Sequence, residues 1–109
     1  MATLAPDNDD KVRVSVKKTL ETLLDHYWRA KNAQPSLRFD EVYALRLAYE
    51  DAVVEYAGLE GRLLQDEILS SDIDVTTFQK AEMDMKSTVE TKAILMVAAD
   101  FVKAMVSLA

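Results

Sequence analysis

Residues 93–109 read AILMVAADFVKAMVSLA, and only Asp100, Lys103 and Ser107 are polar within this stretch. A helix that is apolar on nearly every side must be covered by the rest of its own fold, by another molecule or by a membrane. No glycine or proline follows Gly61, so the last part of the chain lacks the residues that usually end helices. The C-terminal stretch therefore predicts a long helix with extensive apolar contacts.

The start of this final helix is indicated by Thr76 and Gln79, whose T-x-x-Q spacing is typical of a capping box. An unbroken helix from there to the C-terminus would hold about 33 residues and measure about 50 Å. Its apolar stripe contains Phe78 and Met85 in the first half, but the second half is apolar on the opposite side. The apolar face thus changes sides near residues 92–97.

Three explanations of this change of face remain open. The helix bends and packs on its own bundle, its second half packs on another protein or a second copy, or it touches a membrane. The membrane explanation is the weakest, because 17 residues with two central charges fall short of the roughly 20 apolar residues that a span requires. The second explanation predicts a protein-binding surface made of six residues, which are Ile94, Leu95, Phe101, Val102, Met105 and Leu108.

Two earlier helices are indicated by apolar residues that recur every three or four positions. The first extends from about residue 9 or 10 to residue 32, and its stripe contains Val12, Val16, Leu20, Leu23, Tyr27 and Ala30. Residues 32–36 include Pro35 and predict a turn. The second helix carries a stripe of Val42, Leu45, Tyr49, Val53 and Tyr56. The two helices should form an antiparallel hairpin.

Gly58 and Gly61 leave the end of the second helix open. They could form a cap or hinge, because each glycine inside a helix costs about 1 kcal/mol relative to alanine. They could also lie within one continuous helix that reaches Leu69, where two small residues would allow close helix approach. We therefore expect an all-α fold: an elongated antiparallel bundle of three long helices, or four if the chain breaks at Gly58–Gly61. Residues 1–8 should be a flexible tail, and residues 9–109 a single domain.

Charge and composition exclude several functions. The chain has 109 residues and a net charge of −6, and residues 41–74 hold nine Asp or Glu but only two Lys or Arg. Such an acidic chain is poorly suited to neutralising phosphates, so nucleic-acid binding is not expected. The absence of cysteine excludes disulfides and thiolate zinc sites. The first ten residues lack the basic and apolar segments of a secretory signal, which predicts a cytoplasmic protein.

No arrangement of residues predicts catalysis, a cofactor or a metal. The only histidine, His26, lies at the margin of the first stripe and should be a packing residue, and Trp28 and Tyr43 should pack in or beside the core. Helical metal sites need pairs such as Glu-x-x-His, which are absent here. Asp51 and Glu55 lie opposite the apolar stripe of the second helix, and a solvated face or a docking site for a basic partner explains them.

The sequence therefore predicts a non-enzymatic protein-interaction or assembly module. It would self-associate, for instance as a homodimer, or bind a partner helix through the apolar C-terminal helix. Within this class it could be a chaperone or adaptor, or a polymerising subunit of a larger apparatus. The alternative from another class is a small all-α enzyme with a divalent metal bound by carboxylates that include Asp51 and Glu55.

Overall fold

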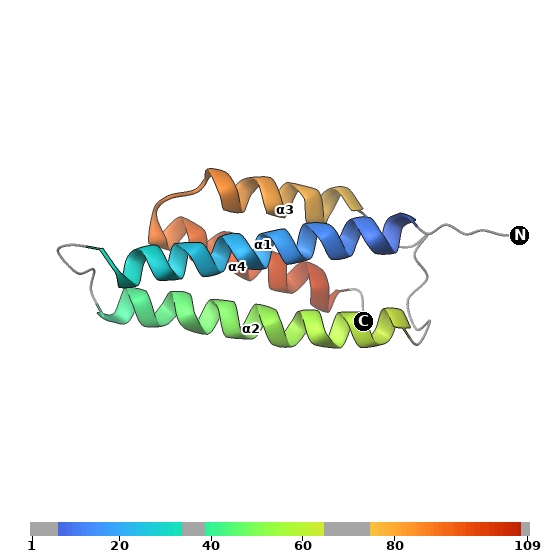
Figure 1. Ribbon diagram of the computed structural model, residues 1–109, viewed down its shortest axis with the longest axis horizontal. Coiled ribbons are helices and arrows are strands. Elements are labelled where there is room, and N and C mark those ends of the chain that lie inside the picture. Colours follow the sequence, from blue (N-terminus) through green and yellow to red (C-terminus); the bar gives the residue numbers. More distant parts are fainter. Residues whose placement is uncertain (1–6, 34–38, 65–74, 108–109) are drawn as a thin grey trace, which may run out of the picture.

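The structure is a computed structural model that describes residues 7–33, 39–64 and 75–107. Four helices account for almost all of these residues, and none of them forms a strand. The helices are α1 (Asp7–Lys31), α2 (Phe39–Leu64), α3 (Val75–Ser87) and α4 (Thr91–Val106) (Figure 1). The predicted all-α bundle is confirmed.

Each helix has two neighbours in the bundle. α1 packs against α2 and α3, and α4 packs against the same two helices, so α2 and α3 occupy opposite corners although they are consecutive in the chain. Consecutive helices run antiparallel, which makes α1 parallel to α3 and α2 parallel to α4 (Figure 1). The 25 and 26 residues of α1 and α2 give each helix a length of about 38 Å, against 21 × 18 Å across the bundle. The bundle is therefore elongated.

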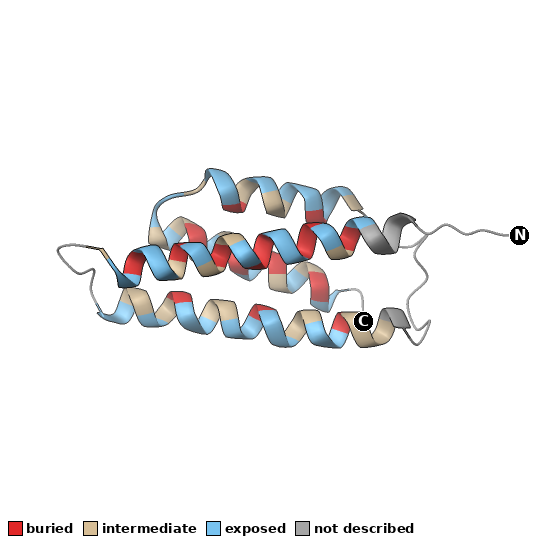
Figure 2. Ribbon diagram, in the orientation of Figure 1, coloured by how far each residue is buried: buried red, intermediate tan, exposed pale blue. Residues whose placement is uncertain are grey.

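The core follows the predicted stripe of α1 closely. Val12, Val16, Leu20, Leu23 and Ala30 are buried, because spacings of three and four bring them to one side of the helix (Figure 2). Tyr27 is half-buried at the margin of this side. The core residues contributed by the other helices are Leu45, Ala52, Leu59, Phe78, Met85, Ile94, Ala98, Phe101 and Met105.

α2 continues through both glycines, so the predicted cap or hinge at Gly58–Gly61 is wrong. Neither glycine has a positive φ, and Leu59 between them is fully buried. Leu59 is buried on the same side of α2 as Leu45 and Ala52, so the helical spacing of the buried residues continues past Gly58. The predicted continuation to Leu69 lies outside the described residues.

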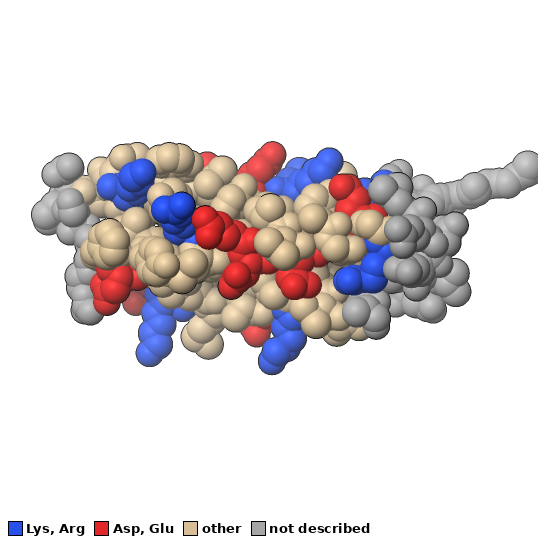
Figure 3. Space-filling model, turned by 90° about the horizontal axis from the view of Figure 1, so that it is seen from below, with Lys and Arg blue, Asp and Glu red and all other residues tan. Residues whose placement is uncertain are grey.

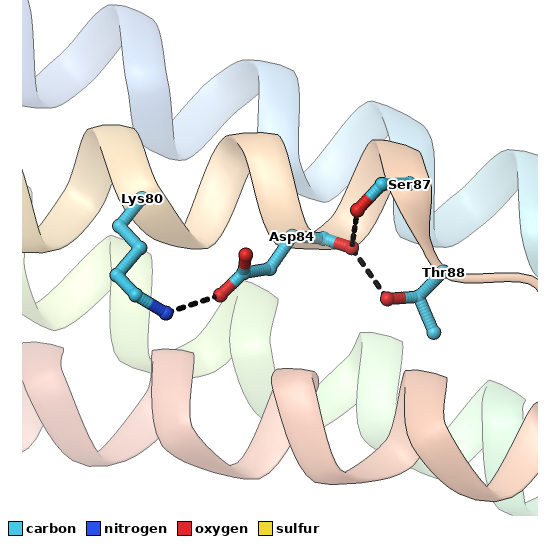
Figure 4. Close-up of polar contacts among 4 residues, drawn as sticks. All are labelled: Lys80, Asp84, Ser87 and Thr88. Atoms are coloured by element: carbon cyan, nitrogen blue, oxygen red, sulfur yellow. Dashed lines mark hydrogen bonds and ion pairs between the residues drawn. The ribbon is translucent and has the colours of Figure 1, made fainter.

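The chain breaks instead at residues 88–90, so the expectation of an unbroken final helix is also wrong. The hydroxyl groups of Thr88 and Ser87 donate hydrogen bonds of 2.6 and 3.3 Å to the carbonyl of Asp84 in the last turn of α3 (Figure 4). Glu90 is extended, with φ −76° and ψ 136°, and its carbonyl accepts the first backbone bond of α4 from Ile94. These hydroxyl groups supply donors to the last turn of α3, where carbonyl groups have no donor within the helix.

This reversal explains why the apolar face changes sides along the predicted final helix. α4 folds back antiparallel to α3, so the apolar sides of both helices face the core of the same bundle. Asp100 and Lys103 then point to solvent, as do Val89 and Met96. α3 begins at Val75, one residue before the predicted start, which places Thr76 inside the helix instead of at its N-cap.

Candidate protein-interaction surface

The six residues predicted to bind a partner fall into three groups. Ile94, Phe101 and Met105 are 3%, 1% and 0% exposed, so the folded chain itself covers them. Leu95 and Val102 are half-buried at the edge of the core. Leu108 lies outside the described residues. In the folded bundle only Leu95 and Val102, among the five described, could touch another molecule, and such binding stays a prediction.

Leu95 and Val102 line a shallow groove of about 280 Å³ between α4 and α2. The other residues of the groove are small or acidic: Ala48, Asp51, Ala98 and Ala99. Alanines on both parallel helices leave the groove without a bulky side chain at its centre. It is therefore an apolar depression with one carboxylate, that of Asp51.

A row of exposed apolar residues lies on the outer side of α2, away from the core. We call Phe39, Tyr43, Leu47 and Val54 the outer strip; they are 83%, 50%, 41% and 67% exposed. Separations of four, four and seven residues place them on one side of the helix. The buried residues Leu45, Ala52 and Leu59 define the opposite side. α2 thus has two apolar sides, of which the fold covers only one.

An aromatic cluster surrounds the first part of the outer strip. The rings of Phe39 and Tyr43 stack with centroids 6.2 Å apart, and those of Tyr27 and Trp28 meet edge to face at 5.2 Å. The Lys31 ammonium lies 5.0 Å from the centroid of the Trp28 ring. A cation at this distance from an aromatic ring is attracted by its π electrons.

Between these rings lies a hollow of about 450 Å³. Its lining is Tyr27, Ala30, Lys31, Phe39, Val42, Tyr43 and Arg46, all from α1 or from the first two turns of α2. Trp28 and Tyr43 are each about half exposed, so their expected packing in or beside the core is wrong. They lie on the side of the α1–α2 pair that faces away from α3 and α4, where no further helix in the described part of the chain covers them.

Charged groups divide the outer side of α2 into two halves. Arg46 donates a 3.1 Å hydrogen bond from Nε to Glu50, and this bond, with the Glu50 charge, raises the pKa of Arg46. Glu50 and Asp51 are exposed at the middle of the helix. Acidic side chains gather at the centre of this face, with basic side chains on either side of them and uncharged areas between (Figure 3). Charged groups therefore interrupt the exposed apolar residues of α2.

The two glycines lie in the second of these halves, and no contact among the described residues requires them. Within the described ranges, a methyl group at Gly58 would meet Nη1 of Arg62, at 3.7 Å, and one at Gly61 would meet no atom within 4 Å. Two glycines inside a helix cost about 2 kcal/mol together relative to alanine. The close helix approach that would justify this cost does not occur within the described residues.

His26 is a buried packing residue, as predicted. Its Nε2 atom lies 2.9 Å from the carbonyl oxygen of Met85 and must carry a proton, because a carbonyl can only accept. Asp51 is exposed and Glu55 half-buried. Among the described residues, no three His, Asp or Glu side chains lie close enough together to hold a metal ion.

Comparisons of the chain with protein-family models, with curated proteins and with solved structures found no match. No helix of the described ranges is long and apolar enough to cross a membrane. The sequence alone predicted a binding surface on α4 and did not reveal the exposed apolar residues of α2. Phe39, Tyr43, Leu47 and Val54 could have been found by testing α2 for a second apolar stripe beside the one that contains Leu45.

Proposed function

We propose that this protein is a non-enzymatic interaction module that binds a protein through the outer strip of α2. The observation that carries the proposal is the second apolar side of this helix, which the chain leaves exposed although the first side is fully packed. Single exposed apolar residues are common on proteins, but several on one side of a helix mark a contact surface or an aggregation liability.

The composition of the surface supports a specific contact. Phe39, Tyr43 and Trp28 are exposed aromatic residues, and Lys31 and Arg46 stand beside them. Aromatic residues and arginine carry much of the binding energy in protein interfaces. The groove with Leu95 and Val102 lies between α2 and α4, beside the outer side of α2, and offers a second apolar depression.

A pair of matched variants tests this proposal. Leu47→Glu combined with Val54→Glu places two charges on the outer strip, whereas Val14→Glu combined with Met83→Glu places two on the exposed side of α1 and α3. All four positions are exposed, so both variants should remain folded. Each protein is cross-linked in native extract, and the attached proteins, including further copies of the chain, are identified by mass spectrometry.

The α2 variant should lose the cross-linked partners that the wild type captures, and the control variant should keep them. Circular dichroism verifies that both variants retain the helical content and melting temperature of the wild type. Equal capture by the wild type and both folded variants would show that the outer strip is not a binding surface.

A further inference from the structure

We propose that the partner of the outer strip is a second copy of this chain, whose α2 packs antiparallel against the first α2 about a two-fold axis. This inference rests on the proposed function and specifies its partner. It follows from the distribution of large and small residues along the exposed side of one helix.

The exposed side of α2 is bulky in its first half and small in its second. Phe39, Tyr43 and Leu47 occupy the first half, and Ala57, Gly58 and Gly61 follow Val54 in the second. An axis between Glu50 and Asp51 places Tyr43 opposite Gly58 of the second copy and Leu47 opposite Val54. Each large ring then meets a position without a side chain, where the two backbones can approach closely.

A two-fold interface must be complementary to itself, because the same patch serves on both molecules. The antiparallel arrangement meets this condition, since the bulky half of each copy covers the small half of the other. A parallel pair would set Tyr43 against Tyr43 and leave the glycines facing each other across a gap. The size pattern therefore selects both the second copy and its direction.

The size of the contact indicates a weak dimer. α2 is about 39 Å long, and a contact strip about 10 Å wide would bury on the order of 400 Å² per copy. Stable complexes typically bury about 800 Å² per partner. Arg46 offsets the charge of Glu50 within each chain, but the two Asp51 carboxylates lie near the axis and repel each other. The dissociation constant should therefore be micromolar or higher.

The first experiment measures self-association by analytical ultracentrifugation between about 10 μM and 1 mM. The wild type should shift from monomer to dimer over this range. Gly58→Leu should stay monomeric, with a dissociation constant at least tenfold higher, because its side chain occupies the place of the Tyr43 ring. Gly58 is exposed, a Cβ there meets only the end of the Arg62 side chain, and leucine has the higher helix propensity, so this variant should fold at least as well as the wild type. Gln79→Leu, at an exposed position of α3, is the control and should dimerise as the wild type does.

A wild type that stays monomeric at 1 mM would overturn self-pairing, while the cross-linking test with the Leu47→Glu and Val54→Glu variant would still decide whether the strip binds another protein. A Gly58→Leu protein that dimerises as well as the wild type would overturn the proposed geometry.

The second experiment determines the direction of the pair. The chain contains no cysteine, so each single cysteine variant reports on one position. Tyr43→Cys and Gly58→Cys proteins are oxidised separately and as an equal mixture. The antiparallel arrangement predicts a disulfide-linked dimer mainly in the mixture, joining one variant to the other. Linkage of Tyr43→Cys to itself at the same rate as to Gly58→Cys would contradict the arrangement.

Discussion

The imidazole of His26 connects α1 to the last turn of α3. Carbonyl groups at the end of a helix have no donor within the helix and need one from elsewhere. Met85 obtains its donor from His26, 59 residues earlier in the chain, whereas Asp84 obtains donors from the neighbouring Ser87 and Thr88. A buried side chain thus completes the end of a helix to which it does not belong.

Removing this side chain should destabilise the protein measurably. His26→Ala leaves the Met85 carbonyl without its donor and opens a small cavity, and we expect a loss of about 2–4 kcal/mol in unfolding free energy. His26→Gln, which keeps a donor group, should lose about half as much. Urea unfolding followed by circular dichroism measures both values. Equal losses in the two variants would mean that packing, and not the hydrogen bond, explains the role of His26.

Tyr56 predicts how stability responds to alkaline pH. Burial, followed by its 2.9 Å hydrogen bond to Glu60, raises the pKa of Tyr56 from 10.0 to about 12. A pKa that is higher in the folded state stabilises the fold below the unfolded value of 10 and ceases to do so as pH rises towards 12. The stability advantage of the wild type over Tyr56→Phe should therefore shrink above pH 10.

Urea unfolding of both proteins between about pH 8 and pH 11.5 measures this difference. Lysine titration affects both proteins alike and cancels in the comparison. A stability difference that stays constant over the whole range would contradict the raised pKa.

At the scale of the element, α2 differs from the other helices because it is apolar on two opposite sides. Gly58 is exposed and Gly61 half-buried, and their ordinary helical conformation means that the described part of the fold tolerates them without requiring them. Glycine is common at helix ends and costs stability inside helices. From sequence alone, a glycine inside a helix can therefore be mistaken for a helix end.

Replacing either glycine by alanine should stabilise the isolated chain. Gly61→Ala and Gly58→Ala each fill open space and should raise the unfolding free energy by about 1 kcal/mol. Thermal melts at low micromolar concentration measure the effect on the monomer. A decrease in the melting temperature would show that these positions need glycine within the chain itself.

At the scale of the molecule, the turn at residues 88–90 decides what covers the apolar C-terminal helix. α4 contributes Ile94, Ala98, Phe101 and Met105 to a core shared by all four helices. Phe101 is fully buried, whereas the next residue, Val102, is half-buried beside the groove with α2. Two residues adjacent in sequence thus differ in burial, one in the core and one at its edge.

Charged substitutions at these two neighbours should have very different effects. Phe101→Asp buries an unpaired charge at a cost of several kcal/mol, against a total stability of roughly 5–15 kcal/mol. This variant should lose its cooperative melting transition. Val102→Asp should remain folded at a cost of about 1 kcal/mol. Circular dichroism melts distinguish them, and a Phe101→Asp protein that melts like the wild type would contradict the core position of Phe101.

Local periodicity allowed the sequence by itself to predict three things: the helical class, the stripe of α1 and the packing role of His26. These features depend on residues within one or two turns of each other. Leu95 and Val102 line the groove beside α2, and their contact with a partner stays a prediction.

Only the tertiary structure decided that a second apolar side of α2 stays uncovered, where the final helix breaks and which chain covers Phe101. A helix with one apolar side buries that side, and the spacing of its apolar residues identifies it. α2 has two apolar sides, and the apolar face changes sides between α3 and α4. Which side is buried therefore depends on which neighbouring helix supplies the larger apolar contact. That contact joins residues far apart in the chain, such as Leu45 and Ile94, and no local spacing encodes it.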